Sequence, residues 1–148
     1  GFGQGAYVAH FDSFMRHYLT SVTGMIPRQG DVYIAYKTYS HEQAAKDRDV
    51  EELVREVWEF SRYYRALVLG QEKDKTLAFS FKDLRELKVD VAYPFLLEVY
   101  RDYDANLLTA EDFIEIVQLV EAYVFRRAIC AVPTNSLNQT FASFGREL

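Results

Sequence analysis

The chain has 148 residues, of which 49% are hydrophobic and 16% aromatic, and this composition excludes an intrinsically disordered chain. Its formal net charge of −5 argues against a broadly basic nucleic-acid-binding surface, so any contact with nucleic acid should be local. The single cysteine, Cys130, excludes an internal disulfide and suits a reducing compartment, which we expect to be the cytoplasm. No stretch reaches the roughly 18 apolar residues of a membrane span, so we expect no membrane partner.

The two ends of the chain differ in composition from its middle. Residues 1–10 hold three of the seven glycines and no initiator methionine, which indicates a chain end or an interdomain linker. A helical pattern continues through the last residues to Leu148. We therefore expect residues 11–148 to form a single helical domain, and the chain to be a piece of a larger protein whose neighbouring domains are its partners.

Helices are predicted throughout the first half of the chain. Residues 8–22 read as a helix that Gly24 closes. Residues 31–43 read as a second helix, although their alternation of apolar and polar side chains also leaves a strand open. A third helix lies between Asp49, a plausible N-cap, and Gly70, which suits a left-handed residue after the last turn.

The third helix has the clearest amphipathic pattern in the chain. Glu51 and Arg55 stand four residues apart on its charged face and should form a weak ion pair. Its apolar side chains recur at three- and four-residue steps, which predicts that they face the core. These are Val50, Leu53, Val54, Val57, Trp58, Tyr64, Leu67 and Val68.

The second half of the chain completes an all-α fold. Short helices are predicted after Ser80 and after Asp90, with these two residues as their caps. A long helix begins after Thr109 and ends before Pro133, and its nearly all-round apolar surface predicts the central, most buried helix. Thr134 should cap a last helix. The sequence thus predicts an irregular bundle of six to seven helices.

Side chains that could carry chemistry are scattered. None of the three histidines, His10, His17 and His41, has a glutamate three residues before it, as the ligand pattern of di-iron bundles requires. Cys130 lies in an apolar stretch, where a buried, inert thiol is a better interpretation than a nucleophile. We therefore expect no metal, no cofactor and no catalytic residue, so that this piece is not an enzyme.

Two adjacent arginines stand inside the apolar run of the long helix. A helical projection places Arg126 on the narrow polar stripe, whereas Arg127 and Glu121 fall among apolar side chains and should be partly buried. A buried guanidinium needs a partner, so we predict that Arg127 takes part in a structural ion pair with a carboxylate from another helix. A contact with a phosphate or with DNA is the alternative.

The segment "YVFRRAICAVPTNSLNQTF" resembles the corresponding part of the GmrSD-like restriction endonucleases, a bacterial family that defends against phage. The order of the upstream segments "FDSFMRHYLTSVTG", "DVYIAYKTY" and "YPFLLEVYRDY" also fits, and the similarity spans residues 11–144. The resemblance implies an all-helical middle region between a ParB-like domain with an Asp-Gly-Gln-Gln-Arg motif, linked to nucleotide use and cleavage, and a His-Asn-His nuclease domain. Neither motif occurs in this sequence, so the resemblance implies no cleavage by this piece alone.

Three functions are compatible with these observations. The first is a non-catalytic helical domain of a modification-dependent restriction endonuclease, which positions the nuclease domains and contacts DNA through Arg126, Asn135 and Asn138. The second is a protein interaction or dimerisation module, because tyrosine-rich surfaces favour binding. The third is an enzyme, which a pocket that gathers His17, Arg127 and an acid would favour.

Overall fold

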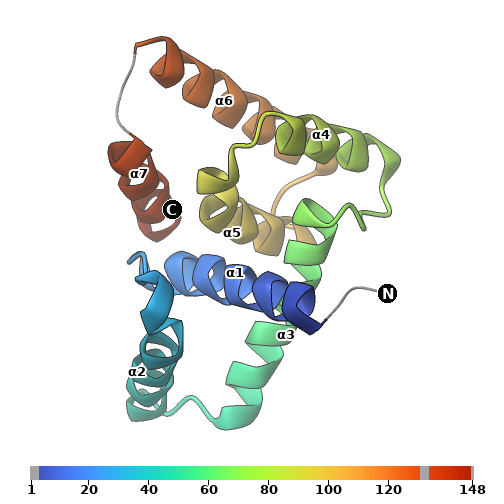
Figure 1. Ribbon diagram of the computed structural model, residues 1–148. Helices are drawn as coiled ribbons and strands as arrows, with labels where there is room; N and C mark the ends of the chain where they lie inside the picture. Colours follow the sequence, from blue (N-terminus) through green and yellow to red (C-terminus); the bar gives the residue numbers. More distant parts are fainter. Residues whose placement is uncertain (1–3, 131–133, 148) are drawn as a thin grey trace.

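The structure is a computed structural model that describes residues 4–130 and 134–147, and the side chains of residues 9–130 and 138–144. The described residues form seven α-helices, two short 3-10 helices and no strand, which confirms the predicted all-α bundle (Figure 1). The α-helices are α1 (Gln4–Thr23), α2 (Val32–Ala45), α3 (Val50–Val68), α4 (Lys75–Glu86), α5 (Tyr93–Asp104), α6 (Ala110–Ile129) and α7 (Thr134–Glu147). The 3-10 helices are η1 (Gln29–Asp31) and η2 (Asp90–Ala92).

Helix α5 lies at the centre of the bundle, since it packs against α1, α3, α6 and α7 (Figure 1). Helix α4 covers α3 and α6, and α7 closes against α1 and α5. Side chains from all of these helices are fully buried together. The largest are Tyr18, Leu19, Phe60, Tyr63, Leu67, Leu77, Phe81, Leu84, Leu96, Leu97, Phe113 and Phe141.

Helix α2 packs on α1 at one edge of the bundle. Tyr39 is its only buried side chain, and Tyr33 and Ile34 are 75% and 61% exposed. The segment is helical throughout, so the alternative of a strand over residues 31–43 is wrong. Its alternating pattern reflects a helix that is exposed on most sides and needs little amphipathicity.

The predicted helix ends are confirmed where a side chain caps the backbone. The carboxylate of Asp49 accepts the backbone N–H of Glu52 at 2.8 Å at the start of α3. Thr109 forms a capping box at the start of α6. Gly24 and Gly70 both have φ of 73°, in the left-handed region that favours glycine after a last helical turn.

Two predicted caps are wrong. Helix α4 begins earlier than Ser80, because the carboxylate of Asp74 accepts two backbone N–H groups at 2.9 and 3.0 Å and starts the helix at Lys75. Asp90 does not cap α5, since it opens the 3-10 helix η2 instead. Helix α5 starts at Tyr93, and Pro94 occupies its first turn, where proline loses no intrahelical hydrogen bond.

Helix α6 is not the central helix, contrary to the prediction. It packs mainly against α4 and α5, and only Phe113, Val117 and Val120 are buried along it. Its outer face exposes three large apolar side chains, those of Leu119 (70% exposed), Phe125 (65%) and Ile129 (69%). Cys130, which was expected to be buried, is also exposed. Helix α6 therefore lies at the edge of the bundle although apolar side chains surround most of it.

None of the helices in the described part of the chain is long and apolar enough to cross a membrane. Pro133, the predicted end of the long helix, lies outside the described residues. Helix α7 begins at Thr134 itself, and the side chain that was predicted to cap it lies outside the described residues.

Candidate ligand-binding cavity

The residues predicted to contact DNA lie on two helices. Arg126 is exposed near the C-terminal end of α6. Asn138 lies in α7 and lines a small cavity whose described lining does not include Arg126. The side chain of Asn135 lies outside the described residues. The structure thus does not bring Arg126 and Asn138 to one site.

Arg127 and Glu121 are both half-buried on α6. Arg127 donates through Nη1 to the hydroxyl of Tyr123 at 2.7 Å, and its guanidinium lies 5.5 Å from the centroid of that ring. Glu121 faces a groove between α6 and the end of α4, where burial raises its pKa and Asp83 adds to the effect. Among the described residues no ion pair joins Arg127 to Glu121, so the ion pair of Arg127 with another helix stays a prediction.

A small polar cavity lies where α1, η2, α5 and α7 meet, with a volume of about 130 Å³. Among the described side chains, five polar ones line it: Arg16, His17 and Thr20 from one face of α1, Asp90 from η2, and Asn138 from α7. The other described side chains of the lining, those of Ile26, Val91 and Pro94, are apolar. The cavity is therefore built from segments that are more than 100 residues apart in the chain.

His17 forms one wall of this cavity with its imidazole packed among tyrosines. The centroid of its ring lies 5.6 Å from that of Tyr93, edge to face, and 6.3 Å from that of Tyr64. Burial lowers the pKa of His17 to about 4, although the carboxylate of Asp90 opposes this shift. The imidazole is therefore neutral at neutral pH. It presents one N–H donor and one bare nitrogen, and no described residue forms a hydrogen bond with either.

Arg16 and Asp90 carry opposite charges into the same cavity. Arg16 donates from Nε to the carbonyl oxygen of Pro27 at 3.1 Å, and this bond fixes its side chain on the loop after α1. Neither residue takes part in an ion pair with any side chain among the described residues. The cavity thus presents a guanidinium and a carboxylate that do not neutralise each other by contact.

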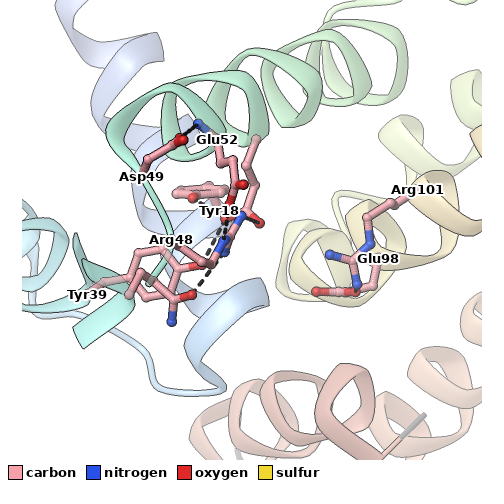
Figure 2. A network of polar contacts seen from close by, with 9 residues as sticks. Tyr18, Tyr39, Arg48, Asp49, Glu52, Glu98 and Arg101 are labelled. Atoms are coloured by element: carbon pink, nitrogen blue, oxygen red, sulfur yellow. Dashed lines mark hydrogen bonds and ion pairs between the residues drawn. The ribbon is translucent and has the colours of Figure 1, made fainter. Parts of the chain in front are cut away.

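A second polar cluster joins α1, α2 and α3 and includes Tyr18, Tyr39 and Arg48, which Figure 2 shows close together. One carboxylate oxygen of Glu56 accepts the hydroxyls of Tyr18 at 2.6 Å and Tyr39 at 2.8 Å, and the other pairs with Arg48 at 3.1 Å. Burial and the contact with Glu56 raise the pKa of Tyr39 to about 12 and that of Tyr18 further. Since every charged or polar partner is satisfied within the cluster, its role is to hold the three helices together.

A neighbouring pair lies on α5 beside this cluster (Figure 2). Glu98 accepts the hydroxyl of Ser21 at 3.1 Å and forms an ion pair with Arg101. Burial raises the pKa of Glu98 despite the opposing charge of Arg101. A groove of about 320 Å³ is lined by Arg48 and Glu56 of the first cluster and by Arg101 of this pair, so that its described lining carries charges of both signs. We interpret this groove as a structural seam rather than a ligand site.

Helix α3 exposes a row of apolar side chains that the sequence pattern predicts to be buried. Val50, Val54 and Trp58 are 75%, 58% and 57% exposed and stand four residues apart, so they lie on one face. The guanidinium of Arg62 lies 4.9 Å from the centroid of the Trp58 ring and continues the row by one turn. We refer to Val50, Val54, Trp58 and Arg62 as the α3 apolar row.

The sequence singles out His17 and Asn138 separately, and no pattern in it connects them. The cavity also contains Arg16, Thr20 and Asp90, which no motif singled out. The only available signal was the i, i+1, i+4 spacing of Arg16, His17 and Thr20, which brings these three to one side of a helix. Among the described residues no group of three metal-ligating side chains is close enough to hold a metal ion.

Comparisons with protein-family models, with curated proteins and with solved structures find no match. The resemblance to the restriction endonucleases therefore rests on the sequence segments quoted above and stays a prediction.

Proposed function

We propose that this chain is a non-catalytic helical domain of a modification-dependent restriction endonuclease, where it positions the nuclease domains of its parent and contacts DNA locally. The resemblance of the segment around Arg126 supports the family, and the parent is then a nucleotide-dependent endonuclease of the cytoplasm. The Asp-Gly-Gln-Gln-Arg and His-Asn-His motifs of that family do not occur in this chain. The role of this chain is therefore to hold the nuclease domains of its parent in position.

The α3 apolar row is the observation that carries the proposal. Apolar side chains on one helix face that are more than half exposed mark contact surfaces when they are contiguous. Trp58 and Arg62 belong to the residue types that dominate binding energy at protein interfaces. Their stacking also holds the indole in place before a partner arrives, which reduces the entropy lost on binding. We propose a neighbouring domain of the same parent as the partner.

The first step of the test is to search the complete reading frame for the Asp-Gly-Gln-Gln-Arg and His-Asn-His motifs, which identify the neighbouring domains. The domains so found are produced as a separate chain and titrated with this one by calorimetry. We expect Trp58→Ala to weaken binding by about 30-fold or more, the effect of a hot-spot residue. Leu107→Ala is the matched control, because Leu107 is 75% exposed but lies outside α3. Equal affinities for the wild-type chain and Trp58→Ala would remove the row from the proposal.

The row also favours the alternative of a dimerisation module. Light scattering of this chain at high concentration distinguishes the two functions. If the chain forms a dimer and Trp58→Ala converts it to a monomer, the partner of the row is a second copy of this chain and not a neighbouring domain.

Contact with DNA is proposed at Arg126, with Asn135 and Asn138 as further candidates. Arg126 is exposed, and its guanidinium forms no hydrogen bond or ion pair with another described side chain. It is therefore available to a phosphate. We expect weak duplex binding that falls steeply with salt, and a salt slope that Arg126→Ala reduces by about one. Filter-binding titrations at several salt concentrations measure it. Arg55→Ala, at an exposed arginine of α3, is the control, and identical binding by Arg126→Ala would end the DNA part of the proposal.

A further inference from the structure

The cavity at His17 shares only Asn138 with the proposed DNA contact, and its other polar side chains have no part in the proposed function. Its described side chains bring a guanidinium, a carboxylate, an amide, a hydroxyl and a neutral imidazole to a volume of about 130 Å³. We propose that this cavity binds a small zwitterion, a free α-amino acid with a short side chain. Its ammonium group would lie at Asp90 and its carboxylate at Arg16 and Asn138.

The pair of charges selects this class of ligand. A simple anion would be attracted by Arg16 but repelled by Asp90. A simple cation would be attracted by Asp90 but repelled by Arg16. An apolar ligand would remove both charges from water without pairing either, which costs free energy. A molecule with both charges pairs each of them, and this matters here because Arg16 and Asp90 form no ion pair with each other.

The neutral side chains of the cavity suit the same ligand. The hydroxyl of Thr20 donates to the backbone carbonyl of Arg16 at 2.8 Å, so its oxygen is left to accept a hydrogen bond from the ammonium group. The imidazole of His17 offers one donor and one acceptor. Ile26, Val91 and Pro94 provide the apolar part of the wall against which a short side chain packs.

The volume of the cavity suits an amino acid with a short side chain. A water molecule occupies about 30 Å³ of the liquid, and a cavity of about 150 Å³ holds benzene. A volume of about 130 Å³ therefore accommodates the whole of glycine, alanine or serine.

The test is a titration of the intact chain with alanine, followed through the imidazole signals by NMR. We expect the signals of His17 to shift and saturate, whereas those of His10 and His41, which lie outside the cavity lining, stay in place. Propionate and ethylamine are the matched probes, because each keeps one of the two charged groups of alanine. Both should bind at least about tenfold more weakly, since each leaves one charge of the cavity unpaired. The proposal would be overturned if the His17 signals did not move, or if propionate or ethylamine bound as tightly as alanine.

Two variants locate the binding. Arg16→Gln and Asp90→Asn should each weaken alanine binding about tenfold or more, because each removes one charge-assisted contact. Both residues are exposed on their outer sides, and circular dichroism confirms that the variants fold. Arg28→Gln and Asp31→Asn change the same residue types outside the cavity lining and should bind alanine like the wild-type chain. Unchanged affinity in both cavity variants would contradict the assignment.

Discussion

The imidazole of His17 is costly to protonate where it lies. Its pKa is about 4 in the folded chain and 6.5 in the unfolded one, so the unfolded chain binds the proton more tightly. The stability that the neutral ring contributes is present above the unfolded pKa of about 6.5 and is lost as pH falls toward about 4. We expect a loss on the order of 3 kcal/mol from this residue between about pH 7 and about pH 4.

Urea unfolding of the wild-type chain and His17→Gln at both pH values measures this loss. Carboxylates titrate over the same range, but they are common to the two chains and cancel in the difference. The stability advantage of the wild-type chain over the variant should shrink by about 3 kcal/mol at the lower pH. A constant difference would show that the ring is solvated in the folded chain.

Glu56 is the single carboxylate on which Tyr18, Tyr39 and Arg48 converge. Glu56→Ala leaves the hydroxyls of Tyr18 and Tyr39 without their acceptor and removes one partner of the half-buried Arg48, and we expect a cost of about 3 kcal/mol. Chemical denaturation measures it. Glu51→Ala on the same helix is the control, because that side chain is 82% exposed and its pair with Arg55 at 3.5 Å should contribute less than about 0.5 kcal/mol. Similar costs for the two variants would contradict this view of the cluster.

The two glutamates also show which contacts a sequence reveals. The pair of Glu51 and Arg55 follows from a spacing of four residues within one helix, and the structure confirms it. The partners of Glu56 come from α1, α2 and the loop before α3, so no spacing within a single helix predicts these contacts. Residue contacts are predictable where the helix itself brings the partners together.

Helices were predictable because their signals are local. Scarce glycine and proline, apolar periodicity and the caps Asp49 and Thr109 all act within a few residues, and these elements form as expected. The start of α4 was missed because Asp74 and Ser80 are both good caps by composition. Asp74 prevails since a start at Lys75 brings Leu77 onto the buried face with Phe81 and Leu84.

The burial of a helix was harder to predict than its existence. Helix α6 has apolar residues on most of its circumference, yet Leu119, Phe125 and Ile129 are exposed. Helix α5 has a charged face and nevertheless contacts four other helices. Burial depends on how many neighbours surround a helix, and periodicity reports only which side of it is apolar.

At the level of the whole molecule, the topology decides where the candidate sites lie. The cavity needs α7 to return to α1, which brings Asn138 next to residues at the opposite end of the chain. No sequence spacing encodes that return. The prediction of one helical bundle was therefore within reach of the sequence, whereas the meeting of Arg16, His17, Asp90 and Asn138 was not.

The apolar surfaces of the molecule are likewise a property of the complete fold. Val50, Val54 and Trp58 have the spacing of core residues, but among the described residues no helix covers the face of α3 on which they lie. The same pattern that predicts a core position becomes a contact surface when the bundle leaves it uncovered.

Trp58 is the only tryptophan in the chain, and it stands in the middle of the exposed row of α3. All indole emission from this chain therefore originates at that surface and at no point of the core. Its wavelength reports whether water or another surface covers α3, and its quenching by small solutes reports how open that surface is. The fold has thus placed an optical reporter, without any label, at the position where a partner is proposed to dock.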